Sequence, residues 1–462
     1  MADPPTYPAR CRCGTAQRGR LARFHHRLPT VTSTALLTDH YELTMLQAAL
    51  HSGAAQRHCV FEVFARRLPE GRRYAVVAGT GRLVEAVHAF RFGDAEIERL
   101  RAADVVDSLT LDYLSGYRFS GDISGYAEGE CYFPESPLLI VEGTFAESVL
   151  LETVLLSILN HDCAIASAAS RMTNAAGGRP CIEMGSRRTH EWAAVAAARA
   201  AYIAGFATTS NLEAGRTHGI PTAGTSAHAF TLLHDDERTA FEAQVASMGP
   251  GTTLLVDTYD VPAAVSLAVE VAGVGLGAVR LDSGDLLVQA REVRAQLDGL
   301  GARATRIIVT SDLDEHAIAA LAAAPVDAYG IGTCLVTGSG APTAGLVYKL
   351  VAREDHAGHL VDVAKQSKDK VTVGGRKWAR RRLNARGQAE AEIIGIGEMP
   401  GAGGDGRALM ADLIREGEIV VDLTLEAARK RCEQSLAELP ARALQLSRGE
   451  PVIPTIFENG HR

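Results

Sequence analysis

Short apolar runs recur after residue 178 of the chain, and segments with helical spacing separate most of them. The runs lack the alternation of apolar and polar residues that a half-exposed strand shows. Such strands, alternating with helices, are typical of a parallel sheet that is buried on both faces. Eight runs within roughly 170 residues therefore predict a compact (β/α) barrel. The runs are PCIEMGS, AGFATTSN, IPTAGTSAHAF, TTLLVDTYD, GAVRLDSGD, RIIVTSDL, VDAYGIGT and GLVYKLV.

The pattern is mixed from about residue 31 to residue 145. The segment TDHYELTMLQAAL has a helix cap at Thr38 or Asp39, and HCVFEVFARRL predicts a strand. The most apolar long stretch, SVLLETVLLSILN at 148–160, places its apolar residues on one helical face and is interrupted by Glu152. It therefore predicts a buried amphipathic helix rather than a membrane span.

Composition narrows the class of protein. A chain of 462 residues is too long for one hydrophobic core. A formal net charge of −8 argues against a general nucleic-acid binder, which needs a surplus of lysine and arginine. Eight scattered cysteines predict neither a zinc site nor a disulfide framework, but reduced thiols in a cytoplasm. The first thirty residues carry six arginines and no apolar segment, which predicts a flexible extension rather than a secretory signal.

Nearly every apolar run ends in glycine or in polar residues. The carboxyl ends of the strands of a parallel barrel share one rim, where active sites are built. At any single run these residues have a simpler explanation as turns and helix caps. His228 in GTSAHAF, at the end of a predicted strand, is equally open to a structural explanation. The convergence of arginines, aspartates and a histidine from seven runs nevertheless favours a functional rim.

The segment VRLDSGD, residues 279–285, carries the richest chemistry of these ends. Arg280 falls within a strand, where a charge is costly unless it meets an anionic or hydrogen-bonding partner. Asp282 and Asp285 could hold sugar hydroxyls, or a Mg²⁺ that is bound through phosphates and water. A buried arginine–aspartate pair is the structural alternative.

Two further runs suit phosphate groups. In GIGTCLVTG the glycines leave backbone N–H groups bare beside the Thr333 hydroxyl, although a tight turn alone would also explain them. Barrels often bind phosphate after their last two strands. In GSRRTHEW, Arg187 and Arg188 supply guanidinium groups that match the paired oxygens of phosphates, and a solvated surface pair is the alternative.

A set of motifs spans most of the chain, from about Leu36 to beyond Trp378: TDHYELTM, LLETVLLSILN, GSRRTHEW, GFATTSN, GTSAHAF, DTYDV, VRLDSGDL, and IGTCLV followed by GLVYKLV. In this order and at this spacing the chain resembles the nicotinate phosphoribosyltransferases. It is more similar to the bacterial and animal nicotinic-acid enzymes than to those that use nicotinamide or quinolinate.

The resemblance implies a reaction. Nicotinate and 5-phosphoribosyl 1-pyrophosphate would give nicotinate mononucleotide and pyrophosphate in NAD salvage, with Mg²⁺ as cofactor. ATP would be a co-substrate, and its hydrolysis would be coupled through a phosphorylated His228. Neutral imidazole is a competent nucleophile towards a γ-phosphoryl group. The resemblance also implies a homodimer with shared active sites.

The same resemblance implies roles for other residues. Tyr41, from the partner subunit, would stack on the nicotinate ring. Ser210 stands where nicotinamide-using relatives carry an aspartate, and it favours the acid because a carboxylate there would repel nicotinate. Met184 stands where many relatives have an aromatic residue against the base. The remaining roles are Arg280 and Thr225 at nicotinate, Asp282 on the ribose hydroxyls, Ser311, Gly332 and Thr333 on the 5′-phosphate, and Arg187 on phosphate or pyrophosphate.

We therefore expect an α/β fold with an irregular (β/α) barrel at residues 146–351. A second α/β domain would combine residues 31–145 with about 352–445, leaving residues 1–30 as an extension and 446–462 as a tail. Three other functions remain open: a nicotinamide phosphoribosyltransferase, a catalytically retired nucleotide-sensing homologue, and an unrelated phosphate-binding lyase.

Overall fold

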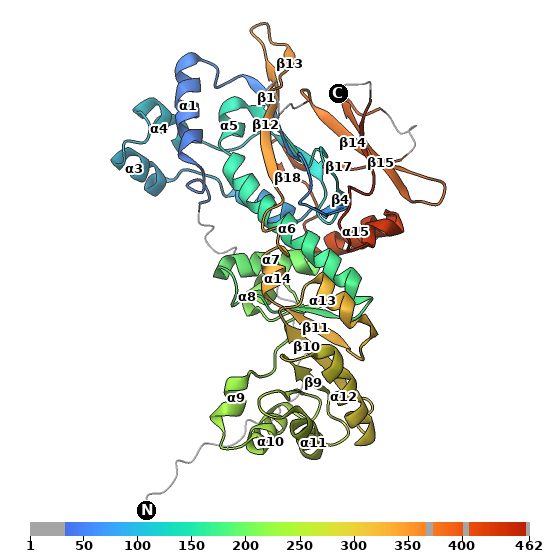
Figure 1. Ribbon diagram of the computed structural model, residues 1–462. Helices are drawn as coiled ribbons and strands as arrows, with labels where there is room; N and C mark the ends of the chain where they lie inside the picture. The colour runs from blue at the N-terminus through green and yellow to red at the C-terminus, as the bar shows by residue number, and fades with distance from the viewer. Residues whose placement is uncertain (1–32, 366–372, 401–405, 459–462) are drawn as a thin grey trace, which may run out of the picture. The chain divides into compact units, whose positions relative to one another are not determined.

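The computed structural model describes residues 33–365, 373–400 and 406–458 (Figure 1). The predicted N-terminal extension, residues 1–30, lies outside the described residues. Within the described ranges, no helix is both long and apolar enough to cross a membrane. The cysteines of the same ranges are all free.

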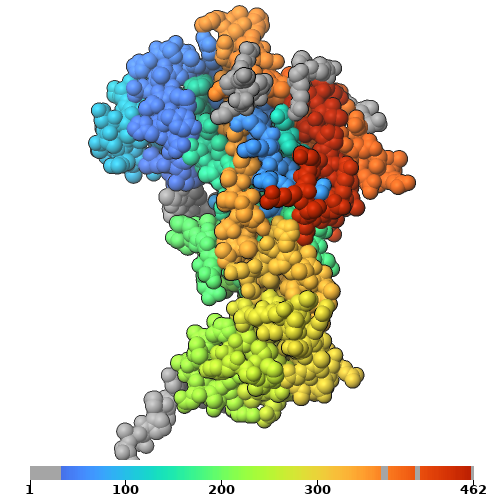
Figure 2. Space-filling model, in the orientation of Figure 1, coloured from blue at the N-terminus to red at the C-terminus, as the bar shows by residue number. Residues whose placement is uncertain are grey.

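A seven-stranded antiparallel sheet combines strands from both ends of the described chain. Its order is β13-β12-β1-β5-β3-β17-β18. Figure 2 shows the blue N-terminal and orange C-terminal residues packed against each other in this region. The strands are β1 (His58–Ala65), β3 (Asp122–Tyr126), β5 (Leu139–Thr144), β12 (Leu346–Glu354), β13 (Leu360–Asp362), β17 (Met410–Arg415) and β18 (Glu418–Ile419).

One predicted barrel strand belongs to this sheet instead. The run GLVYKLV lies in β12, which pairs antiparallel with β1 and places Leu350 opposite Phe61. The prediction of an eighth barrel strand is therefore wrong. Burial along β12 partly alternates, and Lys349 is only half-buried. This pattern is typical of antiparallel sheets rather than of barrel strands.

Six of the predicted runs form a parallel sheet in the order β7-β6-β11-β10-β9-β8. It curls into a half-barrel, and together with the antiparallel sheet and its helices it confirms the predicted irregular α/β fold. Most side chains of these strands are buried, as their apolar sequences predict. The strands are β6 (Cys181–Glu183), β7 (Thr208–Thr209), β8 (Thr253–Leu255), β9 (Ala278–Leu281), β10 (Arg306–Ser311) and β11 (Ala328–Ile331).

The run IPTAGTSAHAF is not a strand. It makes one isolated parallel bridge, between Thr222 and Thr209, and then continues as a loop. His228 begins the short helix α9 (His228–Leu233) rather than ending a strand. The prediction failed here because the segment is mostly small residues and glycine, which offer little side chain to bury against a sheet.

Helix α6 (Glu152–Ala176) connects the two hydrophobic cores. Its first half, including Leu155, packs in the core of the antiparallel sheet, and its second half, including Met172, packs in the core of the parallel sheet. The buried amphipathic helix predicted at 148–160 is therefore confirmed, although it is divided: α5 (Phe145–Val149) ends before α6 begins.

The remaining helices cover the two sheets (Figure 1). Beside the antiparallel sheet lie α1 (His40–Ser52), α2 (Thr80–His88), α3 (Asp94–Ala102) and α4 (Ser108–Ser115). The connections between the parallel strands contain α7 (Glu191–Ile203), α8 (Leu212–His218), α10 (Glu237–Met248), α11 (Val261–Ala272), α12 (Leu286–Gly299), α13 (Glu315–Ala320) and η1 (Leu321–Ala323), and α14 (Thr333–Val336) follows the last of these strands.

A buried ionic network fastens a smaller C-terminal sheet to the N-terminal strands. Arg381 is fully buried, and its Nη atoms donate to Glu130 at 2.9 Å and to Glu392 at 2.5 Å. A buried arginine is tolerated only when its charge is paired in this way. The remaining elements of the structure are β14 (Lys377–Leu383), β15 (Ala389–Ile396), β16 (Arg407–Ala408), β19 (Thr455–Phe457), α15 (Leu425–Glu438), η2 (Ala441–Leu444), and the pair β2 (Ala75–Val76) and β4 (Cys131–Tyr132).

Replacement of Arg381 by alanine should destabilise the fold by roughly 3–5 kcal/mol, because it leaves the buried carboxylate of Glu392 without its counter-charge. Urea unfolding followed by circular dichroism measures the loss. The control is Arg382→Ala in the same strand. Its side chain is 42% exposed and lies 3.8 Å from Glu390, so the cost should stay below about 1 kcal/mol. Equal losses in the two variants would contradict this account of the network.

Candidate active site

A cavity of about 690 Å³ opens at the carboxyl ends of the parallel strands. Its volume is that of an ordinary small-molecule site. The lining carries three arginines and two aspartates, a local surplus of positive charge in a chain whose net charge is −8. Such a lining suits an anionic ligand. These charged residues are Arg187, Arg188, Arg280, Asp282 and Asp312.

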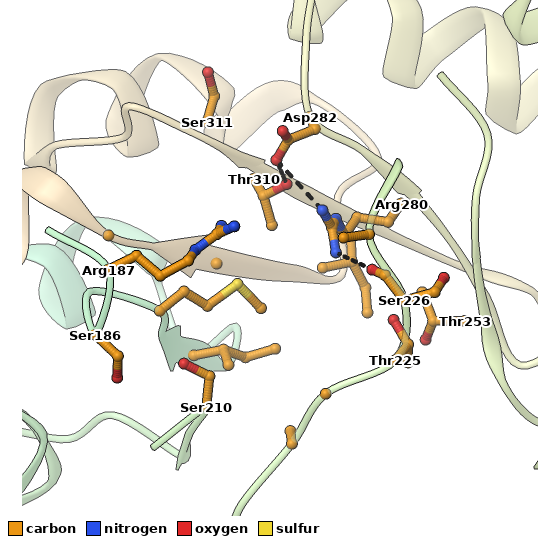
Figure 3. A pocket seen from close by; sticks show the side chains of 18 of the residues that line it. Ser186, Arg187, Ser210, Thr225, Ser226, Thr253, Arg280, Asp282, Thr310 and Ser311 are labelled. Carbon is orange, nitrogen blue, oxygen red and sulfur yellow. Dashed lines mark hydrogen bonds and ion pairs between the residues drawn. The ribbon is translucent and has the colours of Figure 1, made fainter. Parts of the chain in front are cut away.

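Arg280, in β9, reaches into the cavity (Figure 3). Its Nη1 donates to the carbonyl oxygen of Ser226 at 3.1 Å, and its Nη2 lies 3.7 Å from Asp282 Oδ1. The Nε atom is buried and has no hydrogen-bond partner among the described residues. The buried Arg280–Asp282 pair, which was the structural alternative, is therefore only partly formed. The distance between the two groups is longer than a hydrogen bond, and donors of the guanidinium remain free.

Asp282 follows the end of β9 and is held from two sides. The Thr310 hydroxyl donates to its Oδ1, as the dashed line in Figure 3 shows. Its backbone N–H donates to Asp257 Oδ2 at 2.8 Å, and the Ser283 hydroxyl donates to the same oxygen at 2.8 Å. The position of this carboxylate in the cavity is therefore fixed by the ends of neighbouring strands.

His228 lies at the edge of the cavity, next to the lining residue Ala227. Its Nε2 is 3.8 Å from Asp257 Oδ1 and 3.9 Å from Asp282 Oδ2, and its Nδ1 is 3.2 Å from the Thr258 hydroxyl. The ring is 39% exposed, whereas the Asp257 side chain is 2% exposed. The imidazole is therefore oriented by polar groups and open to a ligand, instead of being enclosed by aliphatic side chains.

The predicted phosphate-binding residues come together at the ends of β10 and β11. Ser311, Gly332 and Thr333 all line the cavity, and the Thr333 hydroxyl lies 3.4 Å from Asp312 Oδ1. Arg187 projects into the same cavity from the turn after β6 (Figure 3).

The predicted base-binding residues Met184, Ser210 and Thr225 line the cavity as well. Gly330 makes room for this wall: a Cβ at that position would lie 2.7 Å from Met184 Sδ and 2.5 Å from Thr310 Cγ2. Any larger residue at 330 would push the methionine out of its place.

Two predicted site residues lie elsewhere in their own chain. The Asp285 side chain caps α12 by accepting from the Val288 N–H at 3.2 Å, and it does not line the cavity. Tyr41 lies in α1 and is 45% exposed, and its own chain does not bring it to the cavity. Burial beside Glu152 raises the pKa of its phenol.

Asp257 and Thr310 belong to the site, although neither was among the predicted residues. Asp257 directly follows the apolar run that forms β8, so the rule that strand ends carry the chemistry pointed to it. Thr310 lies inside the apolar run RIIVTS, where its hydroxyl gave no comparable signal.

Comparison with known proteins shows to which family the chain belongs. The sequence model of one protein family, the nicotinate phosphoribosyltransferase (NAPRTase) N-terminal domain, matches residues 36–160. The nicotinate phosphoribosyltransferase pncB1 of Mycobacterium tuberculosis (strain H37Rv) is 59% identical over 429 residues, which cover 91% of this chain and 94% of that protein. The chain belongs to the nicotinate phosphoribosyltransferase family.

Other relatives agree. The family member from Bacillus subtilis is 39% identical over 79% of this chain and 76% of its own length. The crystal structure of human nicotinic acid phosphoribosyltransferase covers 92% of this chain and 98% of its own, with 27% identity and a TM-score of 0.78. The resemblance found in the motifs is thereby confirmed, and the parallel half-barrel and antiparallel sheet belong to the fold of the family.

Proposed function

We propose that the chain converts nicotinate and 5-phosphoribosyl 1-pyrophosphate to nicotinate mononucleotide and pyrophosphate, as a step of NAD salvage. ATP hydrolysis would be coupled through a phosphorylated His228. The observation that carries the proposal is the guanidinium of Arg280, which lines the cavity with an unpaired Nε. Among the described residues no carboxylate is within hydrogen-bond distance of it, so a ligand carboxylate such as that of nicotinate is its natural partner.

The reaction places simple demands on the site. The pyridine nitrogen already carries a lone pair, so no general base is needed. Displacement at the anomeric carbon passes through an oxocarbenium-like state, as in glycoside chemistry. The site must align the ring nitrogen with that carbon and neutralise the departing pyrophosphate. Arg280 and Ser210 would orient the ring, Met184 would pack on it through its thioether, and Arg187 would face the pyrophosphate.

The sugar phosphate would occupy the other end of the cavity. Ser311 and Thr333 offer hydroxyls to a 5′-phosphate, with the backbone of Gly332 between them. Asp282, held by Thr310, would accept hydrogen bonds from the ribose hydroxyls. Thr225 would close the nicotinate end.

Mg²⁺ fits the donor set of the cavity wall, provided that it is shared with the substrate. No group of three or more His, Cys, Asp or Glu side chains within the described ranges could hold a metal ion by itself. Asp282 and Asp312 line the cavity, and Mg²⁺ is commonly bound by one or two carboxylates together with phosphates and water. When bound, the ion would supply positive charge to the leaving pyrophosphate.

The surroundings of His228 suit phosphoryl acceptance. Its Nε2 faces the carboxylates of Asp257 and Asp282, which favour a proton on that nitrogen. The lone pair is then left on Nδ1, beside the Thr258 hydroxyl. Nδ1 would attack the γ-phosphorus of ATP and release ADP. The resulting negative charge next to the cavity would reorganise the pyrophosphate site.

A homodimer with shared active sites would explain the position of Tyr41. Its ring is 45% exposed on α1 and does not line the cavity of its own chain. Exposed Leu36 and Leu37 precede it in the same segment. Apolar and aromatic side chains of this kind are enriched where a partner subunit packs.

The nearest alternative function is that of a nicotinamide phosphoribosyltransferase, and substitution of Ser210 distinguishes the two enzymes. Ser210→Asp should lower kcat/KM for nicotinate by roughly 10- to 100-fold, because it opposes two negative charges across the base pocket. The preference for the acid over the amide should fall with it. Ser210→Asn is the control, since it adds nearly the same volume without charge. Steady-state kinetics with both bases measure the effect, and similar losses in the two variants would show that crowding, not charge, is responsible.

The proposed function is tested by offering the purified chain 5-phosphoribosyl 1-pyrophosphate and Mg²⁺ with nicotinate or nicotinamide, and separating the products by chromatography. We expect nicotinate mononucleotide in the first reaction and little mononucleotide in the second. Product from nicotinamide alone would favour the alternative enzyme. Binding of substrates without any product would favour a catalytically retired homologue or an unrelated phosphate-binding protein.

A further inference from the structure

Glu183 is a buried carboxyl group beneath the wall of the cavity. It is the last residue of β6, it is 1% exposed, and it directly precedes Met184. No Lys, Arg or His side chain of the described ranges lies within 4.0 Å of its oxygens as an ion-pair partner. Burial raises its pKa. Such a group is costly unless all of its hydrogen bonds are satisfied.

The hydrogen bonds of Glu183 connect two turns of the rim. Its Oε1 accepts from the Gly185 N–H in the turn after β6, and its Oε2 accepts from the Thr209 hydroxyl at the end of β7. The Thr209 oxygen accepts in turn from the Asn211 N–H at 3.0 Å. The Asn211 side chain donates from Nδ2 to the Ser186 hydroxyl at 3.0 Å, which closes the circuit back to the first turn.

Backbone contacts restrict both turns further. The Ser210 N–H donates to the Glu183 carbonyl oxygen at 2.8 Å, and the Arg188 N–H donates to the Gly185 carbonyl oxygen at 2.8 Å. Gly185 itself is packed closely, since a Cβ there would lie 2.1 Å from Val336 Cγ1 of α14. The first turn therefore has little freedom to move towards the phosphate end of the cavity.

This circuit holds residues that line the cavity, two of which, Met184 and Ser210, face the proposed base. Met184 and Ser210 each lie between two of its members along the chain, and Arg187 directly follows Ser186. All three line the cavity, whereas Glu183, Thr209 and Asn211 do not. The separation of the two turns therefore sets the position of the base-facing wall.

We propose that Glu183 and Asn211 are positioning residues, which fix the separation of the two turns and thereby determine affinity and selectivity for the pyridine acid. The proposal rests on the proposed function of the same cavity. Neither residue touches the substrate. Displacement of binding groups by about 1 Å can cost about 100-fold in rate, so loosening the circuit should be visible in kinetics.

Three variants test the proposal. Glu183→Ala removes both acceptors, whereas Glu183→Gln keeps one acceptor for Gly185 and can donate to the Thr209 oxygen. Asn211→Ser keeps a good cap for α8 but is too short to reach Ser186. The control is Asp236→Ser, which also places a serine at a helix cap, that of α10, away from the cavity.

Each variant is assayed for KM and kcat with nicotinate and for use of nicotinamide, and its melting temperature is recorded. We expect Glu183→Ala and Asn211→Ser to raise the KM for nicotinate at least about tenfold and to reduce the preference for the acid. Glu183→Gln should stay within about fivefold of the wild type. Asp236→Ser should leave KM unchanged.

A merely structural role would lower the melting temperature and leave KM and the acid-to-amide ratio unchanged. That result in either Glu183→Ala or Asn211→Ser would overturn the proposal, and Asn211→Ser keeps the test valid if Glu183→Ala does not fold. Wild-type chain that forms no product from nicotinate would count against the proposed function itself. Active wild type with kinetically unchanged variants would count against the positioning role alone.

Discussion

Replacement of His228 by alanine is expected to abolish the stimulation of nicotinate mononucleotide synthesis by ATP and to leave a slow, ATP-independent synthesis. The whole ATP-dependent increment should disappear, because the variant has no nucleophile to accept the γ-phosphoryl group. The slow reaction should remain, because Arg280, Asp282 and Arg187 are untouched and no general base is required. Initial rates with and without ATP measure the ATP-dependent increment and the slow ATP-independent rate.

His234→Ala is the control for this variant. His234 lies just after the same helix, α9, and its Nδ1 contacts the Phe230 carbonyl oxygen at 2.8 Å. It does not line the cavity. This variant should keep its ATP stimulation. Equal stimulation in His228→Ala would refute the role of His228 as phosphoryl acceptor, even if the enzyme still made nicotinate mononucleotide.

Replacement of Arg280 by glutamine should lower kcat/KM for nicotinate by about 30- to 4,000-fold. Loss of one partner of a desolvated, hydrogen-bonded charge pair costs about 2–5 kcal/mol, and about 1.4 kcal/mol corresponds to tenfold. The loss should be larger for nicotinate than for nicotinamide. The carboxylate of nicotinate would lose its positively charged partner, whereas the amide of nicotinamide is neutral. Steady-state kinetics with both bases give the two ratios.

Arg306→Gln controls for the removal of an arginine from a strand of the same sheet. Arg306 is exposed at the first residue of β10, at the end of the sheet away from the cavity. Its replacement should leave kcat/KM for nicotinate within about twofold, as expected for a surface substitution. If Arg280→Gln lowered kcat/KM equally for both bases, Arg280 would not be the residue that distinguishes the carboxylate from the amide.

The parallel half-barrel was predictable because its strands are short and buried on both faces. Their apolar runs, such as VDAYGIGT, carry this signal within a few residues. The assignment of GLVYKLV failed because the strand that it forms pairs with β1, almost 290 residues earlier, and no local pattern identifies a partner at that distance. The prediction of a strand at IPTAGTSAHAF failed for a different reason. A loop that must approach a ligand is built from small residues, and such a segment resembles a weak strand.

The site was predictable where a strand end carries a charge. Arg280 and Asp282 were found because charges are rare within an apolar run, and the structure brings both to the cavity. The Asp257–His228 approach depends on the relative position of β8 and α9, which only the tertiary fold determines. Thr209 and Glu183 gave no signal, because a buried polar side chain is distinguished by its partners and not by its place in the sequence.

The central claim is most directly tested by following nicotinate mononucleotide in a reaction that contains nicotinate, 5-phosphoribosyl 1-pyrophosphate and Mg²⁺, once with ATP and once without. We predict product in both reactions, with the rate clearly higher when ATP is present and ADP released as it forms. Failure to form nicotinate mononucleotide under either condition would contradict the account.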